Sequence, residues 1–276
     1  MQRARVLGAA LCCGLALLAI TAGTAAAASP GWAYCAKAVP KNKGNYTDSS
    51  CSVPSSPAGT GKYELAAGVG KGRGFKGKGG TMIWHMVIPG KGDFQISCAS
   101  FKDSGEVAAP NKVFNVVFTF SKCKNLLTVC SSGAKLETVS TERLSGELGW
   151  ISKSGDVAGI DLANEAAPGS GLVVNMECTG FAKIRWSGSL IGQQVGDVGK
   201  ISKTSSISYA VGPYLGEIEP GYYPQTNTPA FEGGATDILL AELNGPETGN
   251  NWEPAGGLPI GIEGAAVNGG EALMVR

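Results

Sequence analysis

The feature that most constrains this fold is a repeated alternation of apolar and polar residues, punctuated by glycine. In segment 183–190, Ile184, Trp186 and Leu190 share one face, and lysine, arginine and serine occupy positions between them. Segment 172–178 alternates in the same way. A period of two residues is typical of β-strands that bury one face. No long window combines a helical period with freedom from glycine and proline.

Glycine supplies 42 of the 276 residues and separates many short segments of this kind. The pattern predicts about 10–12 short strands. The predicted strands are 82–88, 94–98, 114–120, 136–140, 145–152, 157–162, 172–178, 183–190, 201–209, 237–243, 258–263 and 271–275. We therefore predict an all-β fold, a β-sandwich or Greek-key barrel-like single domain that is stapled by disulfides.

The first residues resemble an export signal. Two arginines precede an apolar stretch over 6–20, and three alanines at 26–28 supply the small residues that a signal peptidase needs. We predict a signal peptide at 1–28 and a single secreted domain at 29–276. No later apolar stretch reaches the roughly 20 residues that span a bilayer, so no membrane span is predicted. The expected location is extracellular, including association with the cell envelope.

Six of the eight cysteines follow the predicted signal, and an even number in an exported chain favours disulfides. Six cysteines allow fifteen connectivities. Proximity along the chain favours two short loops and leaves one long-range pair. The predicted pairs are Cys35–Cys51, Cys123–Cys130 and Cys98–Cys178. The cysteine spacings do not match a zinc site, and no cofactor is predicted.

A glycine-rich basic segment at 71–78 is the first candidate binding feature. It matches a G-x-G-x-x-G nucleotide motif, but the segment leads into a predicted strand rather than a helix that could receive phosphate. The plain interpretation is a flexible basic loop. The sharper hypothesis is that four cations contact anionic cell-envelope polymer: Lys71, Arg73, Lys76 and Lys78.

Charge is distributed unevenly along the chain, although the total is only +1. Residues 29–80 carry eight basic and two acidic side chains, a net of +6, whereas 214–276 carry one and nine, a net of −8. Such asymmetry can direct the two regions toward different partners, or it can reflect solvated loops. No nucleic-acid partner is predicted.

The second candidate binding feature is the segment 214–231, which combines aromatic rings with amides and carboxylates. Sugar- and peptide-binding sites use these groups, because rings pack on apolar faces while polar groups fix orientation. An ordinary long loop that packs its own tyrosines has the same composition. The candidate ligand-binding aromatics are Tyr214, Tyr222 and Tyr223.

Catalysis is the alternative to binding. His85 is the only histidine, and no G-x-S-x-G elbow accompanies it, so we interpret it as a structural strand residue and predict no catalytic residues. A hydrolase of extracellular polysaccharide would need only two carboxylates about 5–10 Å apart. The candidate acids, which fall in or beside predicted strands, are Glu137, Glu147, Asp161 and Glu177.

Short motifs in a fixed order carry a resemblance to a known group of proteins. They are Tyr34-Cys35-Ala36-Lys37, Gly44-Asn45-Tyr46-Thr47, Ile96-Ser97-Cys98, Val117-Phe118-Thr119-Phe120, Cys130-Ser131-Ser132-Gly133, Ser145-Gly146-Glu147-Leu148-Gly149-Trp150-Ile151, Gly188-Ser189-Leu190-Ile191-Gly192 and Phe231-Glu232-Gly233-Gly234. Across nearly the whole predicted mature chain, this order resembles a group of uncharacterised secreted proteins found in many divergent copies in some soil actinobacteria. The resemblance implies an exported single-domain β protein with paired cysteines, and it implies no activity.

Together these observations favour an exported, non-catalytic binding module. The expected partner is a cell-envelope polymer, a glycan or another surface protein. A flat face with exposed lysine and tyrosine would favour binding, whereas a concave cleft that holds two close acids would favour the hydrolase. A purely structural secreted protein would have neither feature.

Overall fold

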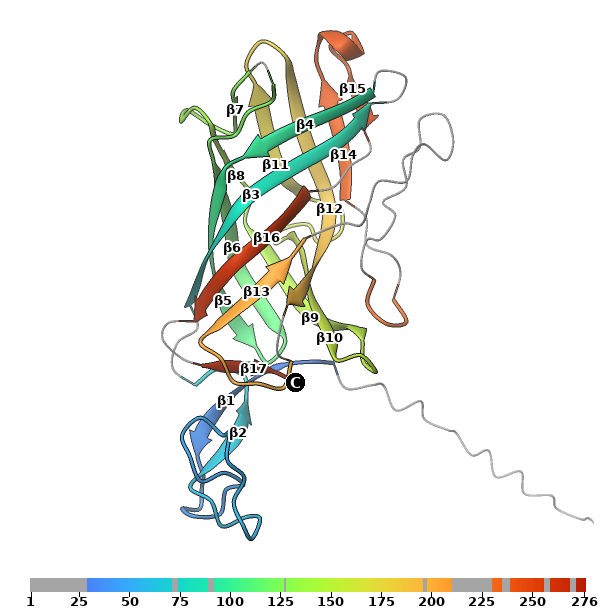
Figure 1. Ribbon diagram of the computed structural model, residues 1–276. Helices are drawn as coiled ribbons and strands as arrows, with labels where there is room; N and C mark the ends of the chain where they lie inside the picture. Colours follow the sequence, from blue (N-terminus) through green and yellow to red (C-terminus); the bar gives the residue numbers. More distant parts are fainter. Residues whose placement is uncertain are drawn as a thin grey trace, which may run out of the picture.

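Figure 1 shows a computed structural model of the chain. The structure describes residues 29–70, 74–88, 92–126, 128–195, 198–209, 230–234, 239–255, 259–268 and 272–276. The predicted signal peptide at 1–28 lies outside these residues.

The described residues form seventeen strands and one short 3-10 helix, η1 (Pro246–Thr248), so the all-β prediction is confirmed. The strands are β1 (Trp32–Lys37), β2 (Tyr63–Ala67), β3 (Gly74–Ile88), β4 (Gly92–Cys98), β5 (Ser100–Ala109), β6 (Lys112–Ser121), β7 (Cys130–Ser131), β8 (Thr138–Ser140), β9 (Leu144–Ser152), β10 (Val157–Asn164), β11 (Leu172–Cys178), β12 (Ala182–Val195), β13 (Thr204–Ser208), β14 (Leu239–Asn244), β15 (Trp252–Ala255), β16 (Pro259–Asn268) and β17 (Leu273–Val275). Every predicted strand overlaps an observed one, and β1, β2, β5, β7 and β15 were not predicted.

Fourteen strands belong to one strongly curled sheet (Figure 1). Its main order is β10-β9-β6-β5-β3-β16-β13-β12-β11-β7, and β4, β8, β14 and β15 attach to members of this path. Because β10 also pairs with β12, the path of pairings from β10 through β6, β3 and β13 to β12 returns to β10. The inner face of the curled sheet is therefore enclosed by its own strands.

Two long strands, β3 and β12, each pair with one set of strands along their first part and with another set along their second part. The first part of β3 pairs with β5 and the second part with β4, so the 74–106 region is one long twisted hairpin with a break at Ala99. In β12, residues 182–188 pair with β11 and β14, and residues 189–195 pair with β10 and β13. These two strands connect the ends of the molecule.

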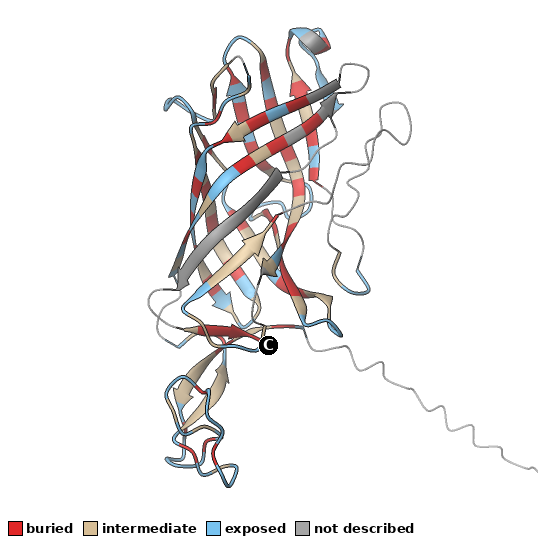
Figure 2. Ribbon diagram, in the orientation of Figure 1, coloured by how far each residue is buried: buried red, intermediate tan, exposed pale blue. Residues whose placement is uncertain are grey.

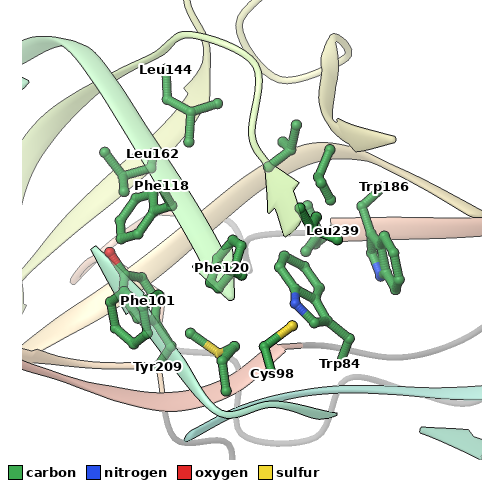
Figure 3. Packing of buried hydrophobic residues seen from close by; sticks show 14 of the residues in the cluster. Trp84, Cys98, Phe101, Phe118, Phe120, Leu144, Leu162, Trp186, Tyr209 and Leu239 are labelled. Atoms are coloured by element: carbon green, nitrogen blue, oxygen red, sulfur yellow. The ribbon is translucent and has the colours of Figure 1, made fainter. Parts of the chain in front are cut away.

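The core fills the inside of the curled sheet, where the buried positions of successive strands face one another (Figure 2). The ring of Trp84 lies 4.8 Å from that of Trp186 and 5.3 Å from that of Phe120, measured between centroids. Phe101 and Phe118 continue this aromatic cluster (Figure 3). A cavity beside the cluster has a volume of about 20 Å³. It can hold one water molecule at most, so this cavity is no ligand site.

A small second sheet, in the order β17-β1-β2, lies at one end of the molecule (Figure 1). β1 pairs with β2 on one side and with β17 on the other, so it joins the start of the described chain to its end. The irregular segment 38–62 between β1 and β2 projects from this sheet as a lobe. The Cys35–Cys51 disulfide ties the lobe to β1.

All six predicted cysteines form disulfides, but two of the three predicted pairs are wrong. The observed pairs are Cys35–Cys51, Cys98–Cys123 and Cys130–Cys178. The first pair confirms the prediction, whereas Cys123–Cys130 and Cys98–Cys178 do not form. The backbone N–H of Cys130 donates to the carbonyl of Cys123 at 3.0 Å, so the two residues are neighbours. Their side chains nevertheless reach the flanking strands β4 and β11, because proximity in a sheet is set by strand pairing rather than by separation along the chain.

Candidate binding surface on β3 and β5

Two of the predicted cations, Lys76 and Lys78, do not lie in a flexible loop. They belong to β3, which begins at Gly74, so this part of the loop prediction is wrong. Glycine has little intrinsic preference for strands. Here the segment is held by β5 on one side and by β16 on the other, and these tertiary pairings override the local preference.

The register of β3 and β5 places a third cation beside these two. Lys78 lies directly opposite Lys102, and Lys76 lies opposite Ser104. All three lysines are exposed. Gly77, which lies between Lys76 and Lys78, and Asp103, which lies opposite Gly77, are buried on the inner face. Lys76, Lys78 and Lys102 therefore project from one outer surface, which we call the lysine face.

The outer surface beyond the lysine face carries few charges. Lys102 is followed in register by Thr119 of β6 and then by Ser140 of β8. Among the outward positions of β5, β6 and β8, the one carboxylate is Glu106, four residues along β5 from Lys102. Four residues of a strand span about 13 Å, so this carboxylate does not pair with Lys102. Its side chain instead accepts a hydrogen bond from Asn115 at 3.4 Å.

The remaining predicted contacts cannot be placed with the lysine face. Lys71 and Arg73 lie outside the described residues, immediately before β3. Tyr214, Tyr222 and Tyr223 also lie outside the described residues. Of the seven predicted ligand-binding residues, the structure therefore brings together Lys76 and Lys78, and it adds Lys102.

Two of the candidate acids do become neighbours. Glu147 of β9 lies directly opposite Asp161 of β10. The Glu147 carboxylate accepts a hydrogen bond from Asn111 at 2.6 Å and lies 3.8 Å from the ammonium group of Lys112. Its side chain is 52% exposed. A carboxylate that acts as a general acid is ordinarily buried away from cations, and the Glu147 carboxylate is exposed beside one.

The other candidate acids are separated from this pair. Glu137 precedes β8, and Glu177 lies on β11 opposite Lys183. Both are exposed. His85 lies on β3 opposite Gln95, and its side chain is outside the described part of the structure. Among the described residues, no group of three or more His, Cys, Asp or Glu side chains could hold a metal ion.

A cluster that the sequence did not reveal lies on the outer face of β12, β14 and β15. Arg185 donates two hydrogen bonds to Glu242, from Nε at 2.6 Å and from a terminal nitrogen at 3.1 Å. The same guanidinium group lies 4.2 Å from the ring centroid of Trp252. The hydrogen bond to Glu242 raises the pKa of Arg185 above its usual range. Because the three residues come from three adjacent strands, this cluster attaches the edge strand β15 to the sheet.

A second local network shapes the projecting lobe. The Asp48 carboxylate accepts hydrogen bonds from the hydroxyl of Ser50, from the N–H of Val53 at 2.7 Å and from the N–H of Ser52 at 3.1 Å. These bonds hold the pKa of Asp48 far below its usual value, and the bond from the Ser50 hydroxyl has the largest effect. The carboxylate organises the turn that carries Cys51.

No protein-family model, curated protein or solved structure shows a significant match to the chain. In the part of the chain that the structure describes, there is no helix of the length and apolar character needed to cross a membrane.

Proposed function

We propose that this chain is an exported, non-catalytic binding protein of the extracellular space or cell envelope, and that its lysine face contacts an anionic envelope polymer. The observation that carries the proposal is the placement of Lys78 directly opposite Lys102 on an exposed face. Like charges directly opposite each other on a sheet destabilise it by a few tenths of a kcal/mol. A ligand with closely spaced negative charges offsets this repulsion.

The spacing of the lysines suits a repeating polyanion. Lys76 and Lys78 are two residues apart on β3, a distance of about 7 Å between their Cα atoms. Lys102 extends the charge across to the neighbouring strand, about 5 Å away. The face is part of a sheet rather than a closed pocket, so a chain-like polymer can lie along it.

The hydrolase alternative has less support. Glu147 and Asp161 are neighbours, but Glu147 is exposed and already engaged by Lys112. The groove of about 430 Å³ elsewhere on the surface has no carboxylate among its lining residues, which are Phe94, Gln95, Ser97, Lys124, Asn125 and Leu126. This groove therefore does not combine a cleft with two close acids.

Co-sedimentation with insoluble cell-wall material tests the proposal. The purified mature protein is mixed with wall sacculi that carry a phosphate-containing polymer and with the same sacculi after acid extraction of that polymer. We expect binding to the intact sacculi that weakens steadily between about 50 and 300 mM salt, because exposed charges are screened over a few ångströms at high ionic strength. Equal retention on extracted sacculi, or retention that is insensitive to salt, would contradict the proposal.

A further inference from the structure

The groove of about 430 Å³ lies between β4 and the hairpin that connects β6 to β7. We call it the β4 groove. One wall is formed by Phe94, Gln95 and Ser97 of β4, and the other by Lys124, Asn125 and Leu126 of the hairpin. Its volume falls in the range of about 300–1,000 Å³ that is typical of ligand sites. It is separate from the lysine face.

The backbone of β4 is only partly paired on the side that faces the groove. On that side, the N–H of Ala99 donates to the carbonyl of Ser121 at 3.0 Å, and Ser97 exchanges two hydrogen bonds with Lys124, at 2.8 and 2.9 Å. Peptide groups of alternate residues point to the same side of a strand. The N–H and C=O of Gln95 therefore also point into the groove. Beside Gln95 the hairpin that connects β6 to β7 has already turned away from β4, and no described strand pairs with β4 on that side.

The two walls of the groove are fixed to each other at its closed end. The Ser97–Lys124 backbone pair joins them, and the Cys98–Cys123 disulfide joins the adjacent residues. Both of these cysteines are fully buried. Leu126 stands at the open rim and is 100% exposed. A groove with fixed walls binds at a lower conformational cost than one that must first become ordered.

We propose that the β4 groove binds an extended acidic and apolar peptide segment of another protein, which adds a strand to β4 at Gln95. An extended backbone is the ligand that satisfies the outward N–H and C=O of a strand edge, and the pockets beside the edge select its side chains. An apolar residue of the peptide covers Leu126, and an acidic residue pairs with Lys124. Groove-to-groove contact between two copies of this chain is less suitable, because each groove offers another Lys124 and no carboxylate among the lining residues.

Selection from a phage-displayed library of random twelve-residue peptides against the immobilised mature protein tests this proposal. The decisive variant is Gln95→Pro, which removes the outward N–H. Proline is tolerated on an edge strand when its nitrogen faces away from the ladder, so the fold should be retained. The matched control is Gln95→Thr, which changes the side chain and keeps the N–H. A second variant, Leu126→Asp, alters a fully exposed side chain and serves if Gln95→Pro does not fold.

We expect the enriched peptides to bind wild type and Gln95→Thr within about twofold of each other. They should bind Gln95→Pro about tenfold more weakly, which corresponds to the loss of the one backbone hydrogen bond that this N–H donates. Binding should also weaken with Leu126→Asp, and bound peptide should slow hydrogen exchange at the Gln95 amide. Three results would overturn the proposal: no enrichment, enriched peptides that bind Gln95→Pro and Leu126→Asp as well as wild type, or wild-type dimers that Gln95→Pro abolishes.

Discussion

Replacing Lys102 with glutamate should stabilise the fold while it weakens polymer binding. Lys102 lies directly opposite Lys78 on the exposed face of β3 and β5. Two ammonium groups roughly 6 Å apart repel by about 0.7 kcal/mol in water, and screening at physiological ionic strength reduces this to about 0.3 kcal/mol. Lys102→Glu converts the repulsion into an attraction of similar size, so the free energy of unfolding should rise by about 0.6–0.7 kcal/mol. Lys102→Gln should gain about half of that.

Thermal unfolding measures this effect, and salt separates it from other causes. A gain of about 0.7 kcal/mol corresponds to a rise in Tm of about 1–3 °C for a chain of this size. At 1 M salt the screening length falls to about 3 Å, so most of the difference from wild type should disappear. A Lys102→Glu protein that is no more stable than wild type at low salt, or whose gain persists at 1 M salt, would refute the reasoning.

Three further predictions concern the disulfides and the projecting lobe. Peptide mapping of a non-reduced digest should recover Cys98 linked to Cys123 and Cys130 linked to Cys178; a Cys123–Cys130 peptide would contradict the structure. Replacing both Cys130 and Cys178 with alanine opens a loop with a sequence separation of 48 residues. This change should lower the free energy of unfolding by about 2–4 kcal/mol in denaturant titrations. An unchanged unfolding midpoint would contradict this prediction. The pKa of Asp48 in the folded protein lies below its unfolded value of 3.8. Its contribution to the stability of the lobe is therefore present above about pH 4 and is lost as the pH falls further. The lobe should therefore become more sensitive to an acid-active protease toward pH 2, and Asp48→Asn should remove that pH dependence, whereas an identical pH profile in both proteins would exclude this role.

The sequence predicts strands best where each inward position carries a large apolar side chain. In 172–178 the predicted boundaries coincide with those of β11, whose inner face holds Val174, Met176 and Cys178. β5 was not predicted, because a buried carboxylate and a glycine lie between Phe101 and Val107 on its inner face. The strand forms because β3 and β6 pair with it on both sides, and this information is not local.

The residues of the lysine face could likewise be predicted only in part from the sequence. Lys76 and Lys78 could be selected from the basic composition of their segment, but Lys102 could not, because only the register of β3 against β5 places it opposite Lys78. The Arg185–Glu242 pair likewise joins two residues that are 57 positions apart in sequence. Strand pairing over such distances leaves no periodic signal in either segment.

The most direct test of the lysine face compares two triple variants in the sacculus co-sedimentation assay. The first carries Lys76→Gln, Lys78→Gln and Lys102→Gln. The control carries the same three changes at exposed lysines elsewhere, which are Lys41, Lys135 and Lys153. Both variants have the same net charge, so a difference between them reports the position of the cations rather than their number. We predict that the first loses most of its binding to polymer-bearing sacculi at low salt while the control retains it. Equal loss in both variants, or full retention in the first, would contradict the assignment of the lysine face as the polymer-binding surface.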